Sequence, residues 1–208
     1  MGEDGVRRAA DLPALRAEAL DCRECELHLT ATHLVMGQGP GRAGVMVVGE
    51  QPLRTENREG RPFTGRAGML MRRALADAGI DPDAVFFTNL VKHSRFDGDD
   101  PTARHVAPLP EQVASCRPHL DAELRIVRPQ VVVLLGRTVT RAVLGPGIGL
   151  RKHRGRRLSA PEHLRLSPSP VVVVTARPTT VHRSRHQDVE YAALVRDLHV
   201  VATCLRSR

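Results

Sequence analysis

The sequence predicts an α/β protein, a three-layer α/β/α sandwich with a central, mainly parallel four-stranded sheet. Four short runs of β-branched and other apolar residues carry this prediction, because they are continuously apolar instead of alternating. Such runs are typical of strands that are buried on both faces of a parallel sheet. Segments with apolar residues at helical spacing lie between the runs, so strand and helix alternate along the chain.

The predicted elements follow one another in a regular order. The strands are GVMVVG at 44–49, AVFFTN at 84–89, QVVVLLG at 130–136 and PVVVVTA at 170–176. Each predicted helix carries one apolar stripe. The stripes are formed by Ala67, Leu70, Ala74 and Ala78, by Cys116, Leu120, Leu124 and Val127, and, in the tail, by Tyr191, Leu194, Val195, Leu198, Val201 and Leu205. The segments at 94–110 and 145–170 are the least regular, and we expect loops there.

Length and composition predict one domain. The 208 residues suffice for a single core, so we assign residues 1–208 to one domain with an N-terminal helical segment at 1–20 and a C-terminal helix at 187–205. Only 2% of the residues are aromatic, so Val, Leu and Ala must fill the core. No apolar run is long enough to span a membrane, and the first residues lack the apolar core of a signal peptide. We therefore expect a cytoplasmic protein without a membrane partner.

The charge of the chain favours a polyanionic partner. Its formal net charge is +8, and of its 31 basic residues only Lys92 and Lys152 are lysines. A basic surface of this kind is typical of nucleic-acid binding that weakens with salt. A surface that is basic only for solubility is the alternative.

Polar side chains follow three of the predicted strands directly. Glu50 follows the first strand, Asn89 ends the second, and Arg177 follows the fourth. Ligands of open α/β sheets bind outside the carboxyl ends of the strands. We therefore expect these residues to form a site, although each of them alone would also suit a loop cap.

Short motifs from Cys22 to the C-terminal helix resemble the uracil-DNA glycosylase superfamily, in particular its iron-sulfur family four and the UdgX-type proteins. The motifs are CREC, GEQP, GRPFTGRAG, TNLVKH, ASCRPHL, VVVLLG and HRG, in this order. The GEQP form and the histidine after VK are similar to UdgX, because ordinary family-four enzymes usually have a cysteine after VK. The resemblance implies a DNA repair glycosylase that acts on uracil-containing DNA.

The resemblance also implies roles in base binding. Such an enzyme flips the target nucleotide into a pocket that reads the edge of the base. Phe63 would stack on the base, Asn89 would pair with the uracil edge, and Gly49 would also belong to the substrate-binding site. Gln51 would help to bind the base or a pocket water. Core packing remains the alternative for Phe63, and a strand-end turn remains the alternative for Asn89.

A loop histidine is the candidate nucleophile. UdgX-type proteins attack C1′ of the sugar with a histidine and stay covalently attached, and the matching residue is His105. Glu50 would activate His105 and stabilise the cationic sugar, since a neutral imidazole is a competent nucleophile beside a carboxylate. A hydrolytic uracil-DNA glycosylase is one alternative. Another is a catalytically weak DNA-binding or lesion-binding homologue with altered base specificity, in which His105 is a solvated loop residue.

Two departures from the family bear on this mechanism. The loop before His105 reads PTARH, which is shorter and less basic than the family's usual loop. In the last motif Arg177 stands where the family has the histidine of His-Pro-Ser. An arginine is always charged, so Arg177 would stabilise the departing base as an anion.

The cysteines suggest a metal group. Cys22 and Cys25 form a Cys-x-x-Cys pair, Cys116 adds a third thiol, and His93 falls where family four places a cysteine. Three thiolates and one imidazole suit a 4Fe-4S cluster and also a structural zinc ion, and the resemblance favours the cluster. Cys204 on the tail helix is expected to be a free thiol.

Basic loops are the candidate DNA contacts. RKHRGRR at 151–157 and VHRSRH at 181–186 can neutralise phosphates without reading sequence. In the family the last loop inserts into DNA beside the flipped base, which makes Val181, His182 and Arg183 candidates, with Arg104 in the loop of His105. We expect a monomer that accepts single-stranded DNA.

Overall fold

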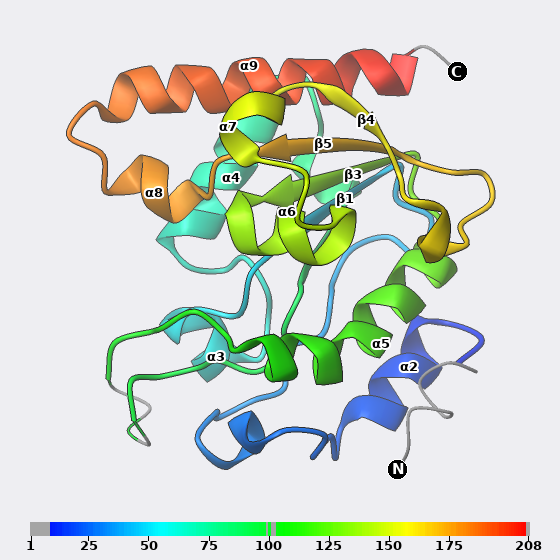
Figure 1. Cartoon of the computed structure of the whole chain (residues 1–208). Helices are drawn as coiled ribbons and strands as arrows, with labels where there is room; N and C mark the ends of the chain where they lie inside the picture. Colours follow the sequence, from blue (N-terminus) through cyan, green and yellow to red (C-terminus); the bar gives the residue numbers. More distant parts are fainter. Residues whose placement is uncertain (1–8, 99, 101–102, 207–208) are drawn as a thin grey trace.

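The fold has a five-stranded sheet at its centre (Figure 1). The computed structural model describes residues 9–98, 100 and 103–206. The strand order is β2-β1-β3-β5-β4. The strands are β1 (Val45–Gly49), β2 (Val85–Asn89), β3 (Val131–Leu135), β4 (Arg157–Ser159) and β5 (Val171–Thr175). The strands β2, β1, β3 and β5 pair in parallel, which confirms the predicted fold class and the four predicted strands.

The strand β4 is an addition to the predicted sheet. It pairs antiparallel with β5 at the edge and lies in the 145–170 segment, where a loop was expected. Arg157 and Ser159 are exposed, and Leu158 is only half-buried. A three-residue edge strand of this kind has no continuously apolar run, so the pattern that predicted the other strands misses it.

Helices cover both faces of the sheet. They are α2 (Leu12–Ala19), α3 (Arg54–Glu59), α4 (Arg66–Asp77), α5 (Pro110–Val127), α6 (Gly136–Leu144), α7 (Leu150–His153), α8 (Pro178–His182) and α9 (Gln187–Arg206). Short 3-10 turns add η1 (Glu26–Leu29), η2 (Pro82–Ala84) and η3 (Glu162–Leu164). The helices α4, α8 and α9 lie on one side of the sheet, and α2, α5 and α6 lie on the other (Figure 1). This arrangement is the predicted three-layer sandwich.

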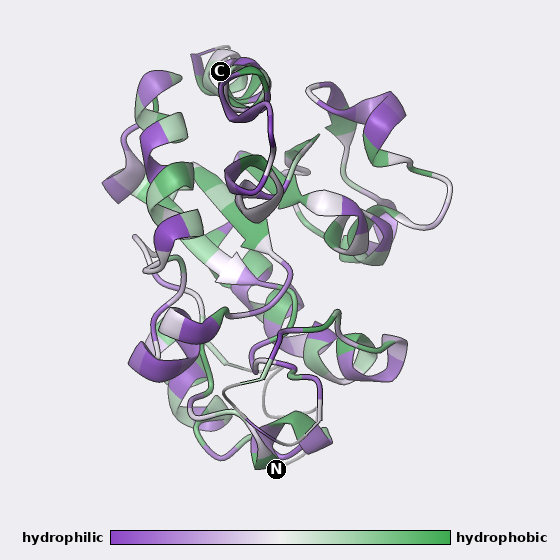
Figure 2. Ribbon diagram, turned by 90° about the vertical axis from the view of Figure 1, so that its left-hand side faces the viewer, coloured by the Kyte–Doolittle hydropathy of each residue, from purple (hydrophilic) through white to green (hydrophobic). Residues whose placement is uncertain are grey.

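The side chains of alternate strand residues pack into two separate cores, one on each face of the sheet. Along β1, for example, Val45 and Val47 pack under α4 and α9, whereas Met46 and Val48 pack under α5 and α6. Successive side chains of a strand point to opposite faces, so a strand with helices on both sides is apolar throughout. Figure 2 shows the apolar strands in green, enclosed by helices with polar outer surfaces.

The predicted helix stripes are largely the buried ones. All four stripe residues of α5 are buried. On α4 the buried face is shifted, because Met71 and Leu75 are buried together with Ala74, while Leu70 is only partly buried. The larger side chains of α4 thus take the core positions. Of the N-terminal helical segment, residues 1–8 lie outside the described residues. In the part of the chain that is described, no helix has the length and apolar character needed to cross a membrane.

The parallel register brings the candidate site together. Gly49 at the end of β1 lies opposite Asn89 at the end of β2, and Leu135 at the end of β3 lies opposite Thr175 of β5. The residues that follow these strands therefore meet at one edge of the sheet, as expected for an open α/β fold.

Candidate active site

Gly49 allows Asn89 and Phe63 to approach the end of β1. A Cβ atom on Gly49 would lie 2.2 Å from Asn89 Oδ1 and 3.1 Å from Phe63 Cζ. The first distance is shorter than any real Cβ contact, and the second is tighter than most of them. The asparagine amide and the aromatic ring therefore share one small space beside a bare stretch of backbone.

Phe63 forms one wall of this space and also belongs to the core. Its ring is buried and lies 5.0 Å from the ring of Phe87, centroid to centroid. Its backbone is left-handed, with φ of 57°, which is unusual for a bulky residue. Such strain persists only where the surrounding structure enforces it, and it clusters at functional sites. The structure thus combines core packing with a position beside Gly49 and Asn89.

A buried glutamate holds the loop that carries Phe63. Glu56 Oε2 accepts a 2.8 Å hydrogen bond from the Leu53 amide, and the Phe63 backbone also stabilises the carboxylate. Burial raises the pKa of Glu56 to about 7, despite these two backbone interactions. The Glu56 side chain therefore joins the two ends of the 53–63 loop.

Glu50 pairs with Arg177 across the end of the sheet. Arg177 Nη1 lies 2.6 Å from Glu50 Oε2, and the glutamate side chain is 11% exposed against 46% for the arginine. The arginine stem packs on Gly136, where a Cβ atom would lie 2.5 Å from Arg177 Cγ. Gly136 has a left-handed φ of 86°, so both its conformation and its neighbour require glycine. The second oxygen of Glu50, Oε1, is buried and has no partner among the described residues.

His105 lies on a folded-back loop that Gln51 contacts through the carbonyl of Val106. The loop is held by a bridge between Phe96 and His105, whose rings are 4.8 Å apart, and by a 2.8 Å bond from the Asp97 amide to the Arg104 carbonyl. Burial lowers the pKa of His105, and the positive charges of Arg54 and Arg183 lower it further. Both effects favour the neutral form of the imidazole.

Contacts of His105 leave one ring nitrogen unused. His105 Nε2 is buried and without a hydrogen-bond partner in the described part of the chain. There, no hydrogen bond joins His105 to Glu50, whose carboxylate pairs with Arg177 instead. The expected direct activation of His105 by Glu50 is thus not present as a contact in this structure.

Gln51 holds the loop of His105 against β1. Its Nε2 donates to the Val106 carbonyl at 2.7 Å, and its Oε1 accepts from the Arg95 amide at 2.7 Å. Both ends of the amide are occupied by backbone on the two sides of the folded-back loop. The structure therefore places Gln51 beneath the loop of His105, with its side-chain amide engaged by protein.

The metal donors come from three separate segments. Cys22 and Cys25 lie before η1, His93 follows β2, and Cys116 lies on α5. Burial raises the pKa of Cys116 to about 12, and the charges of Cys25 and Cys22 add to this shift, so the three sulfurs occupy one region. The Lys92 amide donates to Cys116 Sγ at 3.3 Å.

The histidine of this set is available as a ligand. Burial lowers the pKa of His93 to about 4, so the ring is neutral, and its Nδ1 is buried without a partner among the described residues. His119, one turn after Cys116, is also buried: its pKa is likewise lowered to about 4, and its Nδ1 has no partner among the described residues. Within the described ranges, no three His, Cys, Asp or Glu side chains are gathered closely enough to hold a single metal ion. Three thiols and a neutral imidazole with an unused nitrogen nevertheless fit the chemistry of an iron-sulfur or zinc group.

The candidate DNA contacts differ in exposure. Val181 is fully buried in the core with residues of α4 and α9, so its side chain does not face solvent where DNA would lie. An apolar side chain on the inner face of α8 packs inward, which the motif alone does not reveal. His182 and Arg183 are exposed, and Arg104 is exposed but paired with Asp97 at 3.0 Å.

The basic loop at 151–157 is partly committed to internal contacts. Arg154 pairs with Asp197 at 2.6 Å and with Glu190 at 3.2 Å, both on α9. Thr175 also donates to Asp197. Arg154 therefore fastens α7 to α9, and the exposed basic residues of this loop are the neighbours Arg151, Lys152, Arg156 and Arg157.

Sequence reasoning missed three buried polar residues around the site, namely Glu56, Lys92 and Glu123. Glu123 is hidden in a helix whose charges are otherwise typical of a surface. For Lys92 a signal existed, because it is one of only two lysines in a chain that otherwise uses arginine. The buried site of Lys92 suits the compact ammonium group, whereas Lys152 is exposed.

Comparisons with known proteins show the family of this chain. The uracil DNA glycosylase superfamily matches residues 36–199. Type-4 uracil-DNA glycosylases are similar in sequence. The protein of Thermotoga maritima is 34% identical over 82% of this chain and 87% of its own length. That of Archaeoglobus fulgidus is 40% identical over 58% of this chain, and that of Sulfurisphaera tokodaii 35% over 64%. The chain spans only 57% of the length of each of these two. The chain belongs to the uracil DNA glycosylase superfamily.

Proposed function

We propose that this protein excises uracil from DNA and captures the sugar covalently through His105. One observation supports this proposal most directly. Three buried polar atoms lack a hydrogen-bond partner among the described residues although they lie on candidate site residues, namely Glu50 Oε1, Asn89 Nδ2 and His105 Nε2. An unsatisfied buried polar atom costs about 1–3 kcal/mol, so a substrate that supplies the partners explains why all three persist.

Base recognition would use Asn89 beside Gly49. The flipped uracil presents a carbonyl and an N–H on its pairing edge, and the asparagine amide offers a donor and an acceptor. The unused Nδ2 of Asn89 would donate to the uracil carbonyl. Phe63 would contact the face of the base, because its ring already lies next to Gly49.

Bond cleavage would proceed by separation of charge. The bond between C1′ and the base nitrogen breaks, and its electron pair leaves with the uracil as an anion. Arg177 offers a positive charge for this anion, and Glu50 offers a negative charge for the sugar cation. Their 2.6 Å ion pair keeps the two opposite charges fixed next to each other before the substrate arrives.

Capture of the sugar would follow at His105. The lone pair of the unprotonated ring nitrogen forms a bond to C1′, which gives a positively charged alkylated imidazole. That ring loses its remaining N–H proton to water, and the uracil anion takes a proton from water, so charges and protons balance. The lowered pKa of His105 supports this role because the nucleophile must be neutral.

We propose that Cys22, Cys25, His93 and Cys116 hold a 4Fe-4S cluster, with a structural zinc ion as the alternative. The bound group would supply a cross-link between the N-terminal segment, the end of β2 and α5, since uracil excision needs no electron. Iron and sulfide analysis, together with broad visible absorption of the purified protein, would distinguish the cluster from zinc.

The substrate would be uracil-containing DNA, with single-stranded DNA accepted and the protein acting as a monomer. Exposed basic residues can contact the phosphates. Arg104 lies in the loop of His105, and His182 and Arg183 lie at the end of α8. The net charge of +8 agrees with this partner.

A denaturing gel tests the function. The protein is incubated with end-labelled single-stranded DNA that carries one uracil, boiled in detergent and separated beside His105→Ala. A heat-stable shifted band that the variant lacks would support covalent capture. His199→Ala serves as a control, because this exposed histidine on α9 lies outside the candidate site and is expected to leave the band intact.

Hydrolytic excision is the second candidate function, and the ion pair between Glu50 and Arg177 favours it. That pair leaves His105 without a carboxylate partner in the described contacts, so His105 would orient a water instead. Strand breakage after alkali without a shifted band would show hydrolysis. Binding of uracil-containing DNA without base release would mark the protein as a lesion binder.

A further inference from the structure

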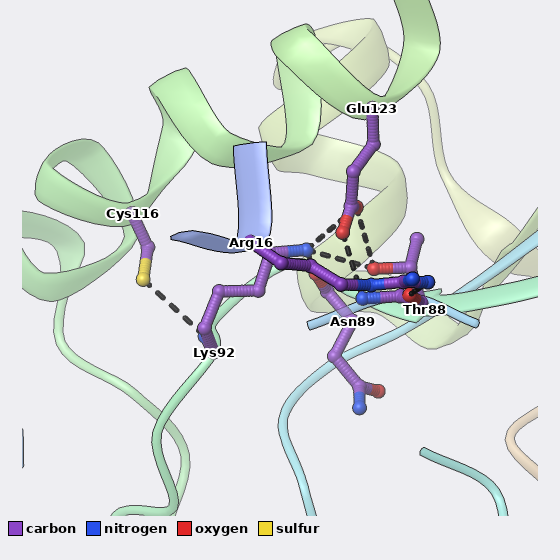
Figure 3. A network of polar contacts seen from close by, with 7 residues as sticks. Arg16, Thr88, Asn89, Lys92, Cys116 and Glu123 are labelled. Atoms are coloured by element: carbon purple, nitrogen blue, oxygen red, sulfur yellow. Dashed lines mark hydrogen bonds and ion pairs between the residues drawn. The ribbon is translucent and has the colours of Figure 1, made fainter. Parts of the chain in front are cut away.

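A buried network of polar side chains lies beside Asn89 at the end of β2 (Figure 3). Lys92 Nζ donates three hydrogen bonds of 2.7 Å each, to Thr88 Oγ1, to the Asn89 carbonyl and to Glu123 Oε2. The side chains of Lys92 and Glu123 are 0% and 1% exposed. All three protons of the ammonium group are therefore used, and this group has no contact with solvent.

Glu123 is equally well satisfied. Its Oε2 also accepts from Thr88 Oγ1 at 2.6 Å, and its Oε1 accepts from the Gly37 amide at 2.8 Å. Arg16 then donates to the Gly37 carbonyl at 2.7 Å. The network thus ties β2 and α5 to the segment around residue 37.

Stability alone is a poor explanation for this pair. Removing two charges from water costs several kcal/mol per ion, and well-packed apolar residues often replace a buried ion pair without loss. The contacts of Lys92 instead concentrate on two functional neighbours. Its ammonium group holds the Asn89 carbonyl, and its own amide donates to Cys116 Sγ, a proposed metal ligand.

The Asn89 side chain depends on this backbone anchor. Its Nδ2 has no partner among the described residues, so no hydrogen bond from this nitrogen fixes the direction of the side chain. Figure 3 shows the side chain pointing away from the network, whereas the Asn89 carbonyl points into it. The orientation of the amide is therefore set by the backbone at residue 89 and by the space beside Gly49.

We propose that Lys92 and Glu123 are positioning residues that fix Asn89 for base recognition. The inference rests on the proposed function, because it assigns the reading of uracil to Asn89. It explains why lysine is kept here in an arginine-rich chain: an ammonium group donates in three directions, whereas a guanidinium is a planar fork.

A double-mutant cycle tests the proposal. Lys92→Met combined with Glu123→Gln removes both charges together and leaves neither ion unpaired. Single-turnover excision of uracil from DNA is measured with and without Asn89→Ala. We expect the paired change to slow excision by about tenfold or more when Asn89 is present, since a displacement of about 1 Å can cost up to 100-fold. In the Asn89→Ala background the same change should cost less than about threefold, because the two changes act through one group.

Equal losses in both backgrounds would overturn the proposal, because the network would then act on stability alone. The matched control is Arg154→Met with Asp197→Asn, which removes the other largely buried ion pair. Its effect on excision should be the same with and without Asn89. If the paired variant does not fold, Thr88→Val, which keeps the shape and leaves the ion pair of Lys92 and Glu123 in place, tests the network in the same cycle.

A crystal structure of the variant separates this proposal from the proposed function. If the wild-type protein does not excise uracil, the proposed function fails, but the position of Asn89 can still be compared between the two proteins. A displaced Asn89 side chain in Lys92→Met/Glu123→Gln supports positioning. An unmoved Asn89 side chain overturns it, whatever the activity of the wild type.

Discussion

At the scale of single residues, the site depends on the absence of a side chain at Gly49. The end of β1 is bare backbone, and this lets the Asn89 amide and the Phe63 ring occupy the space that a Cβ atom would need. The same principle applies at Gly136, which accommodates the stem of Arg177. At both positions a glycine after a buried strand makes room for a polar or aromatic partner.

We predict that Gly49→Ala lowers uracil excision by about 10- to 100-fold, because the new methyl group displaces the Asn89 amide. Single-turnover rates on uracil-containing DNA measure this loss. Gly147→Ala is the matched control, since a Cβ atom there meets nothing within 4 Å. Equal rates for Gly49→Ala and the wild type would show that the contact between Gly49 and Asn89 is unimportant for catalysis.

At the scale of elements, loops and short helices are held by buried carboxyl groups. Glu56 joins the start of α3 to Phe63, and Glu123 of α5 anchors the end of β2 through Lys92. These contacts join separate elements beside the candidate site.

The raised pKa of Glu56 predicts that the stability of the protein depends on pH. Its pKa is raised to about 7 in the folded protein, so the folded state favours the protonated form. This contribution is fully present below the ordinary pKa of a glutamate and is lost as the pH rises through about 7. We therefore expect the Tm of Glu56→Gln to rise relative to wild type between pH 4.5 and pH 8.

Thermal unfolding of both proteins across this range measures the effect. The exposed residue Glu111 gives the control variant Glu111→Gln, whose difference in Tm from the wild type should stay constant. A constant difference for Glu56→Gln as well would contradict the raised pKa.

Metal removal should act on the elements that carry the donors. If Cys22, Cys25, His93 and Cys116 hold one group, chelation or Cys116→Ser lowers the Tm and exposes residues 20–30 and 94–110 to protease. Limited proteolysis with mass spectrometry identifies the cleaved segments. Cys204→Ser, at a buried position on α9, should leave metal content unchanged. An unchanged Tm on complete metal loss would refute the structural role.

At the scale of the whole molecule, charge would govern the proposed encounter with DNA. The net charge of +8 predicts an affinity that falls steeply with salt. Arg183 is exposed at the end of α8, whereas Arg128 is exposed at the end of α5, before β3 begins. The strand register places the candidate site at the opposite end of β3 from Arg128.

We predict that Arg183→Gln weakens DNA binding similarly for all sequences and reduces the slope of log Kd against log salt by about 1. Fluorescence anisotropy at several salt concentrations measures this slope. Arg128→Gln is the charge-matched control and should leave the slope unchanged. Equal effects of the two variants would show that DNA binding follows net charge and not a defined surface.

The sequence by itself determined the fold class and most of the candidate site. Runs of Val and Leu that are apolar on both faces define parallel strands, and the residues directly after such strands must meet at one edge of the sheet. Glu50, Asn89 and Arg177 were predicted on this basis. A local pattern was enough, because successive side chains of a strand point to opposite faces, so a run of consecutive apolar residues identifies a strand that is buried on both faces.

Only the tertiary structure decided which partners these residues have. It paired Glu50 with Arg177 instead of His105, engaged both ends of the Gln51 amide, and buried Val181 in the core. It also placed Lys92 and Glu123 behind Asn89, although they are 31 residues apart. Hydrogen bonds and burial of this kind depend on distances between segments that are remote in sequence, and no local pattern records such distances.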